Sequence, residues 1–196
     1  MSLLVGSDGR ARCQWCGTDP LYVEYHDTEW GVPVHGDREM FERLVLESFQ
    51  SGLSWITILR RREGFRSAFS GFDPHVIARF GASDRARLMA DTGIIRNGAK
   101  IDATIHNAGI VADLIDREPG RLDEIIWEHA PKGSVRRASL AEVPAVTPES
   151  EALARTLKKL GLKFVGPTTA YAHMQAVGVV NDHVDGCWRR LESSLD

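Results

Sequence analysis

Apolar residues recur along most of this chain at the spacing of amphipathic helices, and no stretch shows the alternation typical of a strand. The clearest case is the segment 37–53, where Asp37 is expected to be the N-cap. A longer helix is expected over residues 92–115. The pattern therefore predicts an all-α fold with many short helices. The apolar face of the segment 37–53 consists of Met40, Phe41, Leu44, Val45 and Phe49.

Helix start signals divide the rest of the chain into short helices. A proline at the first helical position follows a capping side chain at Asp19–Pro20, Asp73–Pro74 and Thr147–Pro148. Ser54 and Ser83 are the expected caps of two further helices. In the helix after Asp19, one side is expected to carry Tyr22, Tyr25 and His26.

Two helices joined by a glycine hairpin are predicted between residues 148 and 178. One glycine suits a helix end with positive φ, and another can cap the next helix. The free N–H groups, hydroxyls and positive dipole end of that helix suit a phosphate. An ordinary αα-hairpin whose glycines only form the turn explains this stretch equally well. The groups expected to contact phosphate are Gly161, Lys163, Gly166, Thr168 and Thr169.

Residue types that bind metals lie near both ends of the chain, namely Cys13, Cys16, His26, His35, His183 and Cys187. Zinc in structural sites takes four nitrogen and sulfur ligands. The residues alone leave two sets open, Cys13/Cys16/His183/Cys187 and Cys13/His26/His183/Cys187. Buried free thiols beside a core histidine are the plainer alternative. A zinc site would join the two ends of the chain, and its binding energy would add to folding.

Glu47 lies at the margin of the apolar face of the segment 37–53. A carboxylate in this position is usually solvated, so periodicity alone predicts that Glu47 points to water. Aromatic residues are dense between residues 13 and 37, and such rings usually serve the core.

Length and composition fit one well-buried domain of a globular protein of 196 residues. We expect a flexible lead-in over residues 1–12 and a single compact domain over 13–196, with two helical lobes as a variant. The net charge of −3 argues mildly against non-specific attraction to phosphates. No apolar run approaches transmembrane length, the N-terminus is too polar for a signal peptide, and the three cysteines suit a reducing cytoplasm.

Several motifs, in order over roughly residues 13–187, resemble the bacterial 3-methyladenine DNA glycosylase I family. They are CQWCGTDPLYVEYHDTEWGVP, LESFQSGLSWITILRRRE, DTGIIRNGAKI, LKFVGPTTAYAHMQAVGVVNDHV and the pair His183 and Cys187. The resemblance implies a helix-hairpin-helix fold that binds alkylated double-stranded DNA and excises 3-methyladenine without an organic cofactor. It implies a cytoplasmic enzyme, and no membrane or obligate protein partner is expected. No lysine stands out as a Schiff-base nucleophile, so strand cleavage is not expected.

The resemblance also implies roles for particular residues. One structural zinc is expected on Cys13, His26, His183 and Cys187, with Cys16 as a bystander. Glu47 corresponds to the carboxylate that recognises the base, and the catalytic assignment follows it. The ring pocket corresponds to Trp15, Tyr22, Tyr25, Trp30 and Trp55. The turn at residues 51–54, with Gly52 and Leu53, corresponds to a plug that enters the duplex.

Asp182 is the rival carboxylate, because many helix-hairpin-helix glycosylases keep a catalytic aspartate after the hairpin. It adjoins His183, so we expect a supporting role. Two other interpretations compete with the enzyme. One is a non-enzymatic, zinc-stabilised helix-hairpin-helix module that only binds DNA, and the other is an unrelated zinc-stabilised helical protein with a protein or small-molecule partner.

Overall fold

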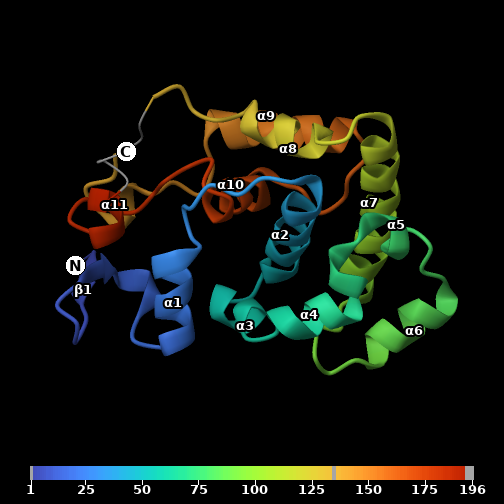
Figure 1. Cartoon of the computed structure of the whole chain (residues 1–196), viewed down its shortest axis with the longest axis horizontal. Helices are drawn as coiled ribbons and strands as arrows, with labels where there is room; N and C mark the ends of the chain where they lie inside the picture. The colour runs from blue at the N-terminus through green and yellow to red at the C-terminus, as the bar shows by residue number, and fades with distance from the viewer. Residues whose placement is uncertain (1, 134–135, 193–196) are drawn as a thin grey trace.

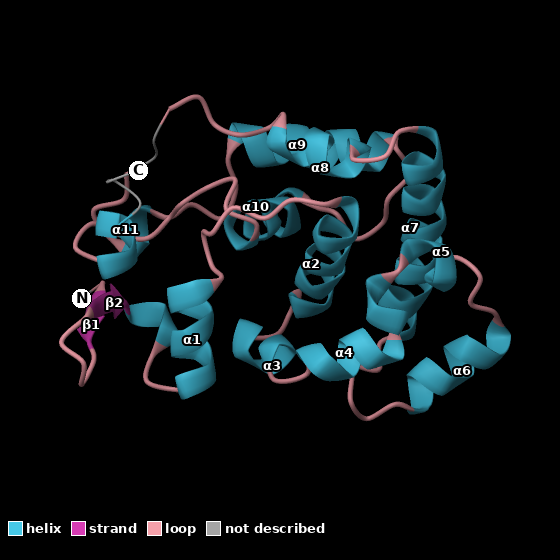
Figure 2. Cartoon of the chain, viewed as in Figure 1, coloured by secondary structure: helices cyan, strands magenta, loops and turns pink. Residues whose placement is uncertain are grey.

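The structure, a computed structural model, describes residues 2–133 and 136–192. It is mostly helical, with one small two-stranded sheet (Figures 1 and 2). Its N-terminal elements are β1 (Leu3–Val5), β2 (Ala11–Cys13), η1 (Gln14–Cys16), α1 (Pro20–Thr28), α2 (Asp37–Gln50), α3 (Trp55–Leu59), α4 (Arg62–Ala68), η2 (Ser70–Phe72), α5 (Pro74–Ile77) and α6 (Ala82–Ala90). The C-terminal elements are α7 (Gly98–Arg117), α8 (Arg121–Trp127), η3 (Leu140–Glu142), α9 (Pro148–Lys159), α10 (Pro167–Ala176) and α11 (Trp188–Glu192).

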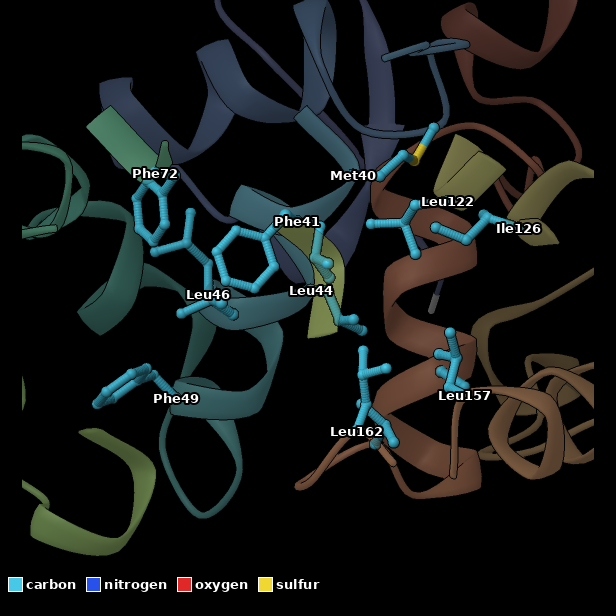
Figure 3. Packing of buried hydrophobic residues seen from close by; sticks show 14 of the residues in the cluster. Met40, Phe41, Leu44, Leu46, Phe49, Phe72, Leu122, Ile126, Leu157 and Leu162 are labelled. Carbon is cyan, nitrogen blue, oxygen red and sulfur yellow. The ribbon is translucent and has the colours of Figure 1, made fainter. Parts of the chain in front are cut away.

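Helix α2 lies at the centre of the molecule and contacts α3, α7, α8 and α10. The apolar face predicted from the sequence is buried, and Figure 3 shows Phe41 and Leu44 of α2 among side chains from other elements, including Leu122 of α8. Burying a side chain of this size contributes roughly 1.5–3 kcal/mol. The core therefore holds the backbone of α2 in place, and this sets the positions from which the side chains on the margin of its apolar face project.

The expected helix starts at Asp19, Asp73 and Thr147 are confirmed. Each of these side chains accepts hydrogen bonds from backbone N–H groups in the first turn that follows it, and a proline occupies the start of each helix. Ser54 also holds its N-cap position, although its hydroxyl bonds to the Thr57 hydroxyl at 2.8 Å. These signals were readable because a cap and its helix are neighbours in sequence.

The predicted cap role of Asp37 is wrong. The N-cap of α2 is Gly36, and Asp37 is the first helical residue. Its carboxylate accepts instead from the N–H of Gly120 at 2.6 Å and of Asp123 at 3.1 Å, at the start of α8. The predicted cap role of Ser83 is also wrong, because the N-cap of α6 is Gly81. Asp37 thus satisfies the free N–H groups of a helix that is distant in sequence.

The small sheet was not expected from the sequence. Strands β1 and β2 pair antiparallel, with Leu3 opposite Cys13, inside the segment for which only a lead-in was expected. Strands of three residues are too short to show alternation. Leu3 packs against the buried cluster of Cys13, Val184 and Cys187, so the hairpin covers the place where the chain ends meet.

The two ends of the described chain lie side by side. In Figure 1, the N-terminal strands and α1 lie on the same side of the molecule as α11, and α11 contacts β2. This brings the first cysteine of the chain beside its last one. Within the described residues, no helix combines the length and apolar character that crossing a membrane requires.

Helices α9 and α10 pack against each other and are joined by the predicted hairpin. Gly161 has φ of +99°, a conformation that favours glycine, and Gly166 is the N-cap of α10. Gly178 follows the end of α10 with φ of +76°, and an added Cβ would lie 2.4 Å from the carbonyl carbon of Val32. A side chain at this position would force α10 away from the segment after α1.

Candidate functional site

A pocket of about 380 Å³ opens between α1, α2, α3, α10 and the turn η3. Ligand pockets are typically of this size or somewhat larger, and their walls are mostly apolar with a few polar groups. The wall here has that character. It is formed by Trp15, Tyr22, Tyr25, Trp30, Glu47, Gln50, Trp55, Leu140, Val143, Ala172 and Gln175.

All five aromatic residues named from the sequence line this pocket. Their rings form a continuous wall, because the Trp15 ring lies 5.0 Å from those of both Tyr22 and Trp30, and the Tyr25 ring lies 5.3 Å from that of Trp55. Contacts at these distances are typical of tilted and edge-to-face aromatic pairs. Segments before α1, within α1, after α1 and at the start of α3 therefore meet at one ligand-sized space.

Glu47 is buried in this wall, with an exposed fraction of only 5 %. The sequence pattern predicted a solvated carboxylate, and that prediction is wrong because α1, α3 and α10 cover the margin of α2. Among the described residues, no side chain or backbone group forms a hydrogen bond or ion pair with it. Burial alone raises the pKa of Glu47 to about 8. In the absence of a cationic ligand, its carboxyl group is mostly neutral at pH 7.

Two neighbouring groups add to the polar character of the pocket. The indole Nε1–H of Trp55 is buried without a hydrogen-bond partner. A buried unsatisfied donor costs about 1–3 kcal/mol, so an acceptor on a ligand would recover free energy there. Burial, with the nearby charge of Glu47, raises the pKa of Tyr25 well above its ordinary value. Its phenol therefore stays protonated.

The structure also assembles the predicted cysteine–histidine cluster. One ligand atom from each of Cys13, His26, His183 and Cys187 lies within 4.8 Å of all the others, and all four residues are buried. The Cys187 Sγ lies 3.5 Å from both His26 Nε2 and His183 Nδ1, and the Cys13 Sγ lies 3.7 Å from His183 Nδ1. Nitrogen and sulfur ligands of a tetrahedral zinc ion lie roughly 3.3–3.8 Å apart, so these distances suit such an ion.

Hydrogen bonds to the outer ring nitrogens orient both histidines toward the cluster. His26 Nδ1 lies 2.8 Å from a carboxylate oxygen of Asp27, and His183 Nε2 lies 3.0 Å from the carbonyl oxygen of Trp30. Both partners can only accept, so these nitrogens carry the protons and the inner nitrogens keep their lone pairs. This arrangement is typical of metal-binding histidines.

The two thiols of the cluster interact with each other. A hydrogen bond with Cys187, together with burial, raises the pKa of Cys13, and the same hydrogen bond lowers the pKa of Cys187. Cys16 is buried but directs its Sγ at the carbonyl oxygen of Gly17, 3.8 Å away, and is not part of the cluster. His35 is exposed and pairs with Asp123. Of the two ligand sets left open by the sequence, the structure assembles the one that contains His26.

The cluster and the pocket are adjacent. The ring of Trp30 lies 4.7 Å from that of His183, and the ring of Trp15 lies 5.3 Å from that of His26. Both tryptophans also line the pocket. Ordering the cluster therefore supports one wall of the pocket.

Asp182 lies outside the pocket wall and is fully buried in a hydrogen-bond network. It accepts from the Tyr171 hydroxyl, from Arg137 Nε at 3.0 Å and from Gln175 Nε2 at 2.8 Å. These contacts agree with the expected supporting role. Gln175 donates one of its two amide hydrogens to Asp182 and also lines the pocket, where its carbonyl oxygen and its second amide hydrogen are available to a ligand. Gln175 could not be predicted as a pocket residue, because the other residues that line the pocket lie mostly in distant segments of the chain.

The two segments expected to contact DNA both project apolar side chains into solvent. In the turn after α2, Gly52 has φ of +86° and Leu53 is 42 % exposed. In the hairpin between α9 and α10, Phe164 is 44 % exposed and has φ of +58°, which is uncommon for a non-glycine residue. Lys163, Thr168 and Thr169 are exposed or half-buried.

This protein is therefore a helical protein with a binding pocket. A buried acid without a partner, among electron-rich rings, suits a flat, positively charged ligand. The family model described as methyladenine glycosylase matches residues 15–190. The chain belongs to this family.

Similar proteins include the Escherichia coli (strain K12) DNA-3-methyladenine glycosylase 1, 45% identical over 179 residues, which are 90% of this chain and 95% of that protein. The Haemophilus influenzae DNA-3-methyladenine glycosylase is 40% identical over 178 residues, covering 90% of this chain and 96% of that protein. A crystal structure of 3-methyladenine DNA glycosylase I has a TM-score of 0.86 at 46% identity, covering 90% of this chain and 98% of the other. Another, of a variant in complex with 3-methyladenine, has a TM-score of 0.84 at 28% identity, covering 90% and 96%.

Proposed function

We propose that this protein is a DNA glycosylase that hydrolyses the N-glycosidic bond of 3-methyladenine in alkylated double-stranded DNA. The family membership and the names of the relatives support this activity. The observation that carries it is the carboxyl group of Glu47, buried without a partner in a wall of aromatic rings. The domain expected over residues 13–196 is proposed to form around this pocket, and residues 134–135 and 193–196 of that range lie outside the described part of the chain.

The pocket suits a methylated purine that has swung out of the duplex. Extruding a base costs a few kcal/mol, and the loss of pairing in a damaged base lowers that cost. Stacking on rings such as Tyr25 and Trp55 contributes about 1–3 kcal/mol per base, and a positive charge strengthens attraction to the ring faces. Favourable contacts are thus greatest for a cationic base.

Glu47 is proposed to recognise the adenine edge. A carboxylate accepts hydrogen bonds from the exocyclic amino group of adenine, whereas the carbonyl of guanine at the same place would be repelled. The positive charge of the methylated base also favours the ionised form of Glu47, which burial alone disfavours. Recognition of the base and ionisation of Glu47 therefore reinforce each other.

The alkylated base already carries a positive charge and leaves readily. When the bond between the base and the sugar breaks, its electron pair goes to the base, which becomes neutral, and the sugar is left as a cation. Water then adds to the sugar carbon and releases a proton. Ionised Glu47 can stabilise the positive charge that develops on the sugar electrostatically. Among the described residues no lysine lines the pocket, which supports hydrolysis without a Schiff-base step or strand cleavage.

We further propose that one zinc ion occupies the cluster of Cys13, His26, His183 and Cys187 and is structural. With four protein ligands, no coordination position remains for water or substrate. The role of these residues is to tie the N-terminal segment to the segment after α10, beside the tryptophans of the pocket.

Backbone contacts with DNA are proposed for two segments. The turn with Gly52 and Leu53 would fill the space vacated by the extruded base. The hairpin with Gly161, Lys163, Gly166, Thr168 and Thr169 would hold phosphates at the start of α10. Such contacts position the enzyme on the duplex without reading its sequence.

The activity is tested by incubating the purified protein with duplex DNA treated with dimethyl sulfate and separating the released bases by chromatography. We expect free 3-methyladenine to appear in proportion to enzyme and time, with much less 7-methylguanine. DNA without enzyme measures spontaneous release. Release no faster than in that control would reject the glycosylase and leave a DNA-binding protein as the function, which salt-dependent affinity for the same duplex would then identify.

A further inference from the structure

Lys100, near the start of α7, is a buried lysine with an unusual set of partners. Its Nζ donates to the backbone carbonyl oxygens of Phe49 at 3.0 Å and Ser51 at 2.8 Å. These carbonyls lie where α2 ends and the turn at residues 51–54 begins. Among the described residues, no carboxylate pairs with this ammonium group. A buried charge with only backbone partners is costly, and burial lowers the pKa of Lys100.

Asn107, further along the same helix, holds the hairpin between α9 and α10 in a similar way. Its side chain is buried and makes two hydrogen bonds with the backbone of Lys163, donating to the carbonyl oxygen at 2.9 Å and accepting from the N–H at 2.8 Å. This pair of bonds fixes the backbone next to Phe164, the residue with positive φ. The exposed side chains of the hairpin therefore project from a backbone that α7 holds.

Lys100 and Asn107 lie on one face of α7. They are two helical turns apart, a separation of about 10 Å along the axis. The buried Thr104 lies between them on the same face, and its hydroxyl donates to the carbonyl oxygen of Lys100. One rigid helix thus holds both the turn that exposes Leu53 and the hairpin that exposes Phe164.

We infer that Lys100 and Asn107 are positioning residues, which set the spacing of the turn at residues 51–54 and of the hairpin at residues 161–166 so that both engage one DNA duplex together. The inference rests on the proposed function, because it takes both segments as DNA contacts. Neither residue lines the pocket, so neither is expected to touch the base. Their effect is expected on KM for DNA, because displacing either segment weakens its contact with the duplex.

The test compares the variants Lys100→Met and Asn107→Leu with Asp102→Asn. Asp102 is exposed on the same helix and pairs with Arg85, so its replacement is the matched control. Two quantities are measured for each folded variant. The first is KM and kcat for base release from alkylated duplex DNA, and the second is the affinity for free 3-methyladenine, measured by quenching of tryptophan fluorescence.

We expect KM for DNA to rise about tenfold in both variants, equivalent to the loss of one net hydrogen bond with its geometry. The affinity for free 3-methyladenine should stay within about twofold of the wild type, and the control should match the wild type in both assays. Should Lys100→Met fail to fold, Lys100→Gln, which places a neutral amide on a shorter side chain in place of the ammonium group, replaces it in the same comparison.

A double-mutant cycle distinguishes positioning from general stability. If Lys100 acts through the turn, then Leu53→Ala should lose most of its effect on KM in the Lys100→Met background. Asn107→Leu and Leu53→Ala, which act on different segments, should combine nearly additively.

Unchanged KM for DNA in both variants, or a parallel loss of affinity for free 3-methyladenine, would overturn the inference while leaving the proposed function intact. A wild-type protein that releases no base would overturn the proposed function, and the inference with it.

Discussion

Replacing Glu47 by glutamine is expected to stabilise the protein while it impairs the proposed activity. Burial raises the pKa of Glu47 from 4.5 to about 8. In the unfolded chain this carboxyl group ionises above pH 4.5, whereas in the folded protein it stays protonated until about pH 8. The unfolded state therefore loses its proton first as the pH rises, and the free energy of unfolding falls between these values.

The size of this effect follows from the separation of the two pKa values. Each pH unit in this window costs about 1.4 kcal/mol, so Glu47 lowers the free energy of unfolding by roughly 3 kcal/mol at pH 7 and by roughly 5 kcal/mol above pH 8. Glutamine has a similar shape and does not ionise. The variant should resemble the wild type near pH 4.5 and become progressively more stable than it as the pH rises.

Urea-induced unfolding at pH 5, 7 and 9 measures this difference directly. The transition midpoint of Glu47→Gln should exceed that of the wild type by an increasing margin, with an unchanged slope against denaturant. Glu39→Gln, an exposed position on the same helix, is the control and should follow the pH dependence of the wild type. A stability difference between Glu47→Gln and the wild type that is the same at pH 5 and pH 9 would refute the reasoning, because Glu47 would then not be ionising at a cost in the folded protein.

The remaining predictions concern the cluster and the pocket. Purified protein should contain about one equivalent of zinc by elemental analysis, and Cys16→Ser should keep it whereas Cys187→Ser should lose it. Retention of zinc by Cys187→Ser would reject the proposed ligand set. Trp55→Phe removes a buried donor without a partner, so the free energy of unfolding should be unchanged or higher by about 1 kcal/mol, while the affinity for 3-methyladenine falls. If Trp55→Phe and the wild type bind 3-methyladenine with equal affinity, the indole N–H does not contribute to recognition of the base. Borohydride should trap no covalent complex with DNA, and a trapped adduct would contradict hydrolysis without a lyase step.

Most helices could be predicted because their signals are local. Asp73 caps the helix that follows it, and the apolar face of α2 can be read from residue spacing alone. The errors arose where a local signal served a distant element. Asp37 looks like the cap of α2, yet it accepts hydrogen bonds from the start of α8, which only the tertiary fold brings near. Strands β1 and β2 were missed because each three-residue strand is stabilised by pairing with the other and carries no signal of its own.

The candidate site was predictable in its residue types but not in its environment. The five aromatic residues and the cluster ligands were named from motifs, and the structure gathers both groups. The burial of Glu47 could not be read from α2, because it depends on α1, α3 and α10 covering one margin of the helix. Likewise, residue spacing alone left His26 and Cys16 both open as ligands, and the resemblance favoured His26, which the fold places 3.5 Å from the Cys187 sulfur.

The most direct test of the central claim is the single-turnover rate of 3-methyladenine release by Glu47→Gln at saturating alkylated duplex, measured beside its affinity for the same DNA. A carboxylate that stabilises the developing sugar cation accounts for roughly 100-fold or more in rate. We predict a loss of that size with the affinity for DNA unchanged. Release at the wild-type rate would contradict the proposal that Glu47 and the surrounding rings form the site of base excision.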